Sequence, residues 1–133
     1  MLTTLIRRFL LDTNILIALF AREAGVIQQL QQAVVVILPC IAFGELYYGA
    51  RKSNRVAANV ERVDNLAAQN VVLNCDLETS QQYALIKEAL RAKGRPLPEN
   101  DIWIAALAVQ HNLVLVTRDA HFDEIDGLQV VAW

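Results

Sequence analysis

The chain has 133 residues, of which 55% are hydrophobic and 20% charged, and its formal net charge at pH 7 is −2. This length and apolar content fit a single domain over residues 1–133 with a real core, and they exclude a disordered chain. The apolar run over residues 9–20 is interrupted at Asp12 and is too short for a membrane span or a clean signal peptide, so we expect a cytoplasmic protein with no membrane partner.

Apolar strands alternate with helices along the chain. A buried strand is expected at residues 7–11, then helices at 15–21 and 26–32, a β-branched strand at 33–38 and a helix opened by Pro39. The later elements are expected to be a helix at 55–68, a strand at 70–73, a helix at 76–93, a loop at 94–98, a helix from Asn100 or Asp101 to about His111, a strand at 113–117, a loop with a short helix at 118–126 and a strand at 129–132. This alternation predicts an α/β fold with a parallel sheet and helices on both faces.

Two aspartates follow the carboxyl ends of apolar strands. Asp12 comes after the strand at 7–11, and Asp119 comes after the strand at 113–117. In open parallel sheets, ligands bind outside these ends, in the crevice where the strand order reverses. If the two strands are neighbours, both carboxylates project into that crevice. Asp101, in the helix before the second strand, and Glu45, inside an apolar stretch beside Gly44, are two further candidates.

Each acid taken alone has an ordinary explanation. Asp12 suits a helix cap, Asp101 the first turn of a helix, Asp119 a turn and Glu45 an exposed helix surface. Four carboxylates in one place would repel each other unless a cation joined them, and Mg²⁺ and Mn²⁺ prefer oxygen ligands. Such an ion activates water for attack on a phosphodiester. It also makes an acidic pocket attractive to phosphate, which offsets the mildly acidic net charge.

Four blocks of sequence resemble the PIN-domain ribonucleases, and within them the VapC-like toxins of toxin–antitoxin pairs. The blocks are Phe9-Leu10-Leu11-Asp12-Thr13-Asn14-Ile15-Leu16, Phe43-Gly44-Glu45-Leu46-Tyr47-Tyr48-Gly49-Ala50, Pro98-Glu99-Asn100-Asp101-Ile102-Trp103-Ile104-Ala105-Ala106, and Leu115-Val116-Thr117-Arg118-Asp119 with His121-Phe122, Ile125, Gly127-Leu128 and Trp133 after it. The resemblance covers essentially the whole chain. It implies a three-layer α/β/α sandwich with a central parallel sheet in the order 3-2-1-4-5.

The resemblance also implies a site and an activity. Mg²⁺ or Mn²⁺ would be bound by Asp12, Asp101 and Asp119, with Glu45 as the further acid. Many members of this family carry asparagine at the position of Asp119, whereas this chain keeps the acid. The implied activity is metal-dependent cleavage of RNA by an endoribonuclease toxin. The implied partners are RNA, a second copy of the chain in a homodimer, and a small antitoxin that buries an apolar segment in a groove and masks the acidic site.

Three polar residues next to the acids would support this site. They are Thr13, Asn14 and Thr117, and their alternative roles are those of helix cap and strand-end residues.

Two other functions compete with this one. A catalytically weak PIN fold that binds a protein or RNA partner would be favoured by the loss of one of the four acids, and none is lost. An aspartyl phosphotransferase or receiver-like fold would use Asp12 as a nucleophile. That chemistry requires a second aspartate close to the first, or a lysine after a later strand, and the sequence offers neither around Asp12 or Asp119.

The remaining reactive side chains receive simpler interpretations. Cys40 and Cys75 lack metal-ligand spacing and are expected to be buried as small hydrophobic residues. His121 is a candidate for substrate contact because it lies close to Asp119. Glu99 and Asp123 are expected to be surface acids. Basic residues are expected either on a solvated face or in contact with RNA phosphates, and these residues are Arg51, Lys52, Arg55, Lys87, Arg91, Lys93, Arg95 and Arg118.

Overall fold

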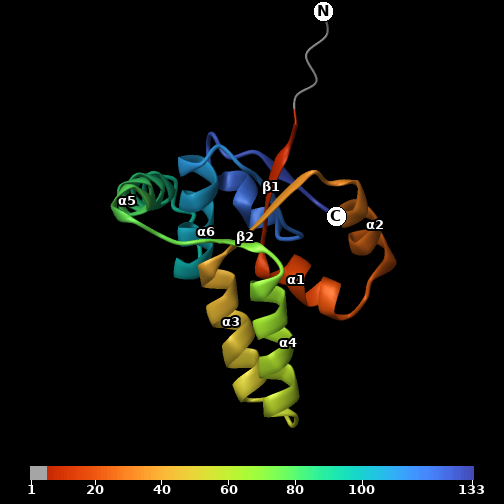
Figure 1. Ribbon diagram of the computed structural model, residues 1–133. Coiled ribbons are helices and arrows are strands. Elements are labelled where there is room, and N and C mark those ends of the chain that lie inside the picture. The colour runs from red at the N-terminus through yellow and green to blue at the C-terminus, as the bar shows by residue number, and fades with distance from the viewer. Residues whose placement is uncertain (1–5) are drawn as a thin grey trace, which may run out of the picture.

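The computed structural model describes residues 6–133, which form a parallel sheet covered by helices on both faces (Figure 1). The strands are β1 (Arg8–Leu11), β2 (Val35–Pro39), β3 (Val71–Leu73), β4 (Val114–Val116) and β5 (Val130–Val131). They lie in the order β3-β2-β1-β4-β5, and every pairing is parallel. The predicted three-layer α/β/α sandwich and its strand order are therefore confirmed. Because β1 pairs with β2 on one side and β4 on the other, the carboxyl ends of β1 and β4 border the crevice where the strand order reverses.

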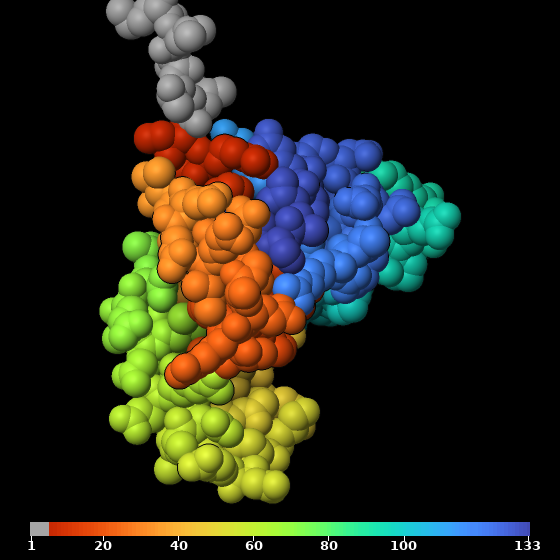
Figure 2. Space-filling model, turned by 90° about the vertical axis from the view of Figure 1, so that its right-hand side faces the viewer, coloured from red at the N-terminus to blue at the C-terminus, as the bar shows by residue number. Residues whose placement is uncertain are grey.

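Helices connect these strands across residues 6–133. They are α1 (Thr13–Phe20), α2 (Ala24–Gln32), α3 (Cys40–Arg51), α4 (Val56–Ala68), α5 (Leu77–Ala92), α6 (Glu99–Gln110) and a 3₁₀ helix, η1 (Ala120–Glu124). α3 and α4 pack side by side as a hairpin that extends beyond the carboxyl edge of the sheet and stands out from the body (Figures 1 and 2). No helix in the described part of the chain combines the length and the apolar character that crossing a membrane requires.

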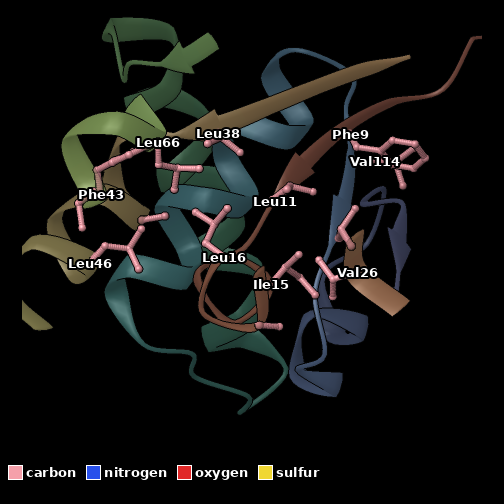
Figure 3. Packing of buried hydrophobic residues seen from close by; sticks show 14 residues of the cluster. Phe9, Leu11, Ile15, Leu16, Val26, Leu38, Phe43, Leu46, Leu66 and Val114 are labelled. Carbon is pink, nitrogen blue, oxygen red and sulfur yellow. The ribbon is translucent and has the colours of Figure 1, made fainter. Parts of the chain in front are cut away.

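Alternate side chains of the central strands enter two separate hydrophobic clusters. Phe9 and Leu11 pack on one face with Val114, against α1 to α4 (Figure 3). Leu10 and Leu115 point to the other face, against α5 and α6. Successive residues of a strand face opposite sides of a sheet, so a continuous apolar run is what a strand buried on both faces needs.

Two expectations about local structure are wrong. α6 begins at Glu99 with Pro98 at the cap position, so Asn100 and Asp101 lie inside its first turn instead of capping it. The fixed φ of proline suits a helix start, and this leaves the Asp101 side chain free for contacts elsewhere. The cysteines are not buried, because Cys40 is half-buried and Cys75 is exposed. Cys75 follows β3, the edge strand of the sheet, which pairs with a neighbouring strand on one side only.

Candidate active site

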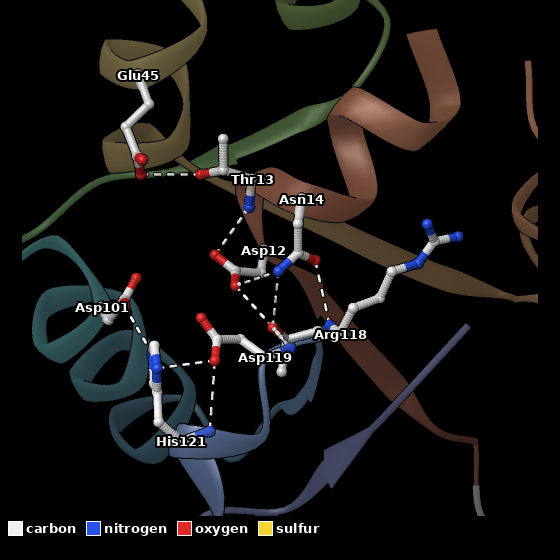
Figure 4. A network of polar contacts seen from close by, with 9 residues as sticks. Asp12, Thr13, Asn14, Glu45, Asp101, Arg118, Asp119 and His121 are labelled. Carbon is white, nitrogen blue, oxygen red and sulfur yellow. Dashed lines mark hydrogen bonds and ion pairs between the residues drawn. The ribbon is translucent and has the colours of Figure 1, made fainter. Parts of the chain in front are cut away.

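Asp12 is a buried carboxylate at the end of β1. One oxygen, Oδ1, accepts a hydrogen bond from the backbone N–H of Thr13 at 2.8 Å, which caps α1. The other, Oδ2, accepts from the Thr117 hydroxyl at 2.7 Å and from the Asn14 amide at 3.3 Å (Figure 4). Only 4% of Asp12 and 3% of Thr117 are exposed. The capping role and a role in the site are thus compatible, since each uses a different oxygen.

The Thr117 hydroxyl joins the segments that follow β1 and β4. Its oxygen accepts hydrogen bonds from Asn14 Nδ2 and from the backbone N–H of Asp119, both at 3.1 Å. Asn14 also accepts a bond through Oδ1 from the backbone N–H of Arg118 at 3.2 Å. These bonds hold the loop that carries Asp119 against the start of α1.

The other three acids reach the same place from different elements. Glu45 projects from α3 and accepts a hydrogen bond from the Thr13 hydroxyl at 2.9 Å. Asp101 lies in the first turn of α6, and Asp119 caps η1 by accepting from the backbone N–H of His121 at 3.4 Å. The carboxylates of Asp12, Glu45, Asp101 and Asp119 face a common space (Figure 4). The structure therefore brings together all four acids that the sequence singled out.

Burial and mutual repulsion raise the pKa values of three of these acids. Burial is the largest cause of the raised pKa of Asp12, and the charges of Asp101 and Asp119 add to it, while the hydrogen bonds from Thr117 and Thr13 oppose it. Burial also raises the pKa of Glu45 and that of Asp101, with further contributions from neighbouring acids. Raised pKa values mean that this site favours a proton or a cation over bare carboxylates.

The donor set fits a hard divalent cation. Within residues 6–133, the ion pairs of lysine and arginine involve other acids: Lys87 with Glu99, Lys93 with Asp126 and Arg118 with Glu23. Lysine and arginine side chains of these residues thus do not neutralise the four acids. Carboxylate oxygens are the ligands that Mg²⁺ and Mn²⁺ prefer.

His121 lies between two of these acids, in a position that the sequence did not reveal. Its Nε2 is 2.8 Å from Asp101 Oδ2, and its Nδ1 is 2.7 Å from Asp119 Oδ1 (Figure 4). One ligand atom from each of the three residues lies within 4.8 Å of the others. The only signal in the sequence was its spacing of two residues from Asp119, and that signal suggested no more than contact with a substrate.

The comparisons with known proteins agree with this geometry. The profile of the PIN domain family matches residues 9–128. The chain belongs to the PIN-domain family. Ribonuclease VapC2 of Haemophilus influenzae is 30% identical to this PIN domain over 129 residues, which cover 95% of this chain and 98% of that protein. The tRNA(fMet)-specific endonuclease VapC of Salmonella typhimurium is 29% identical over 129 residues, with the same coverage.

A solved structure shows the same fold. In the crystal structure of DNA-bound VapBC from Salmonella typhimurium, one chain matches this PIN domain with a TM-score of 0.89 and 27% sequence identity. The match covers 96% of this chain and 98% of that chain. The resemblance to PIN domains and to VapC proteins that the sequence predicted is confirmed.

Two charged residues near the site of this PIN domain, Arg118 and Glu99, form ion pairs outside it. Arg118 is next to Asp119 in sequence, but its side chain pairs with Glu23 and donates through Nε to the backbone carbonyl of Trp133 at 3.1 Å. Glu99 and Asp123 are exposed, as predicted, and Glu99 pairs with Lys87 outside the four-acid site.

Proposed function

We propose that this protein is a metal-dependent endoribonuclease that hydrolyses RNA phosphodiester bonds and acts as the toxin of a toxin–antitoxin pair. One observation carries the proposal: four carboxylates from separate elements converge in the crevice at the carboxyl ends of β1 and β4 (Figure 4). The names of its relatives, which are ribonucleases of the VapC group, point the same way. We also propose that the chain forms one nuclease domain, because both hydrophobic clusters pack against the same sheet.

The four acids would share the chemistry. Asp12, Asp101 and Asp119 would hold Mg²⁺ or Mn²⁺, with Glu45 as the fourth acid at the site. When bound, the ion would neutralise the cluster and polarise the phosphodiester. Glu45 is half-buried and has a raised pKa, and these properties suit it to accept a proton from the attacking water.

Three polar side chains would position two of these acids, Asp12 and Glu45. Thr13 donates to Glu45 Oε1, and Thr117 and Asn14 donate to Asp12 Oδ2. These bonds fix the direction of each carboxylate before an ion or substrate arrives, which is how a preorganised site lowers the cost of reaction. We therefore assign Thr13, Asn14 and Thr117 as positioning residues.

The proposed partners follow from the same site. A groove of about 210 Å³ runs between α1, α3 and α4, and its lining is mainly apolar, with Glu45, Asn59 and Arg62 as the polar residues. An apolar segment of an antitoxin bound in this groove would also cover the acidic site. Exposed apolar side chains on α5, Leu77 and Leu85, support a homodimer. RNA is the proposed substrate and the cytoplasm the proposed location, and transfer RNA is the first substrate to test because a relative is named for it.

The deciding experiment is RNA cleavage with Mg²⁺ or Mn²⁺ and with EDTA, for the wild type, Asp101→Asn and Asp123→Asn. We expect cleavage with either ion, none in EDTA and none with Asp101→Asn. Asp123 is an exposed acid outside the cluster, so its variant controls for a change of charge and should remain active. Full activity of Asp101→Asn, or cleavage that survives chelation, would contradict the proposal. RNA binding without cleavage by the wild type would favour a binding module instead.

The toxin role has its own test. Expression of the wild type should arrest growth, and co-expression of the product of a neighbouring small gene should relieve the arrest. Growth arrest that persists with the Asp101→Asn variant would show that the toxicity does not depend on the acidic site.

A further inference from the structure

The His121 ring contacts the carboxylates of two of the proposed metal-binding acids, Asp101 and Asp119. It is the second residue of η1, and 33% of its side chain is exposed, compared with 18% for Asp101 and 42% for Asp119. The ring packs against Phe122, with the two ring centres 5.0 Å apart. The imidazole therefore has a fixed place at the rim of the site, with both nitrogens turned toward carboxylates (Figure 4).

The spacing of its contacts is close to that of ligands on one ion. With metal–ligand bonds of about 2.1 Å, adjacent ligands of an octahedral ion lie about 3.0 Å apart and opposite ones about 4.2 Å apart. Nε2 lies 2.8 Å from Asp101 Oδ2, and suitable atoms of Asp101, Asp119 and His121 all lie within 4.8 Å of one another. One ion can thus contact all three residues after small adjustments of the side chains.

We propose that His121 is itself a metal ligand. Nε2 binds the ion beside Asp101, and Nδ1–H donates to Asp119 Oδ1, so that the second nitrogen orients the first. The other oxygen of Asp119, Oδ2, then remains for the ion. Metal-bound histidines usually donate their other ring N–H to a carboxylate in this way. The inference rests on the proposed function only in that a divalent ion occupies the acidic site.

A nitrogen ligand makes the site selective among ions. Mg²⁺ takes oxygen ligands almost exclusively, whereas imidazole binds transition-metal ions. His121 therefore shifts the preference of this PIN domain from Mg²⁺ toward Mn²⁺. Its loss should weaken Mn²⁺ binding about 10–100-fold, by analogy with the loss of other groups that support a metal site. The affinity for Mg²⁺ should change much less.

Pulsed electron paramagnetic resonance of the Mn²⁺-loaded, tag-free protein tests this directly, because a bound imidazole imposes a ¹⁴N modulation on the Mn²⁺ signal. The chain has two histidines, and His111 caps the far end of α6, about 15 Å along the helix from Asp101. We expect the ¹⁴N modulation in the wild type and in His111→Gln, and its replacement by the ¹⁵N pattern when histidine is labelled with ¹⁵N. The labelled wild type needs no substitution, so a folding defect cannot mimic the result.

The outcomes separate this inference from the proposed function. Mn²⁺ that binds without imidazole modulation, and is lost in Asp101→Asn, would overturn the role of His121 and leave the acidic metal site standing. A wild type that binds no Mn²⁺ would overturn both. Loss of the modulation in His121→Ala, with Mn²⁺ still bound more weakly, would support the inference. Titration of Mn²⁺ and Mg²⁺ by calorimetry then gives the change in preference.

Discussion

Replacing Thr117 with valine removes one hydroxyl from the centre of the site and keeps nearly the same shape. The hydroxyl donates to Asp12 Oδ2 at 2.7 Å, and both residues are almost fully buried. In valine a methyl group replaces the hydroxyl, so the charged carboxylate of Asp12 loses one hydrogen bond. The amide of Asn14 and the backbone N–H of Asp119 also lose an acceptor. The substitution is therefore far from conservative despite the similar volume.

The size of the effect follows from these contacts. A hydrogen bond to a charged group contributes about 1.5–3 kcal/mol to stability. A chain of 133 residues has an unfolding entropy of about 0.28 kcal/mol per kelvin, so the melting temperature should fall by about 5–10 °C. The pKa of Asp12 should rise further, because the Thr117 hydrogen bond is the main influence that lowers it.

Thermal unfolding followed by circular dichroism, in EDTA at pH 7, measures this effect. Thr117→Ser is the matched control, because it keeps the hydroxyl and loses one methyl group, which costs about 0.8 kcal/mol and so about 3 °C. We expect the order wild type, serine variant, valine variant, from most to least stable. A valine variant that melts at or above the serine variant would show that the hydroxyl does not stabilise Asp12 as described.

Three more predictions concern the acids and the thiols. In EDTA, the raised pKa values of Asp12, Glu45 and Asp101 mean that the folded state binds protons more tightly than the unfolded state, so the free energy of unfolding should fall as the pH rises above 4.5. Urea unfolding between pH 4.5 and 7 measures this, and a slope of the opposite sign would contradict it. Glu45→Gln should slow single-turnover RNA cleavage about 100-fold or more with nearly unchanged Mn²⁺ affinity, and an unchanged rate would exclude Glu45 as the base. Partial desolvation of the thiol, with Cys40 nearby, raises the pKa of Cys75 to about 11. Iodoacetamide should therefore alkylate Cys75 slowly at pH 8 although the residue is exposed, and Cys40→Ala should speed the reaction as measured by mass spectrometry.

The sequence located two of the four acids by physical argument alone. Asp12 and Asp119 follow apolar strands, and parallel strands end at the same edge of a sheet, so their meeting depended only on β1 and β4 being neighbours. Glu45 and Asp101 lie on helices, and the resemblance joined them to the site. Topology explains them as well. α6 runs back along the sheet to β4 and so begins at the carboxyl edge, and α3 begins at the same edge directly after β2.

The contacts of side chains were harder to predict. His121 reaches Asp101 across 20 positions of sequence, and no local pattern encodes such a contact. The exposure of Cys75 depends on β3 lying at the edge of the sheet, which apolar neighbours in the sequence do not reveal. α6 begins at Glu99 with Pro98 at the cap position, without the polar cap that helices usually prefer, and Asp101 contacts His121 in the site instead.

The pairing of β1 with β4 has a consequence for how the protein is made. These neighbouring strands are more than 100 residues apart in the chain, and Thr117 contacts Asp12 across 105 positions. A ribosome synthesises the chain from Asp12 toward Asp119, so the growing polypeptide lacks the fourth carboxylate until late in translation. The cluster of acids can assemble only after β4 has emerged and joined β1. A nascent chain of this protein therefore lacks the assembled acidic site for most of its synthesis.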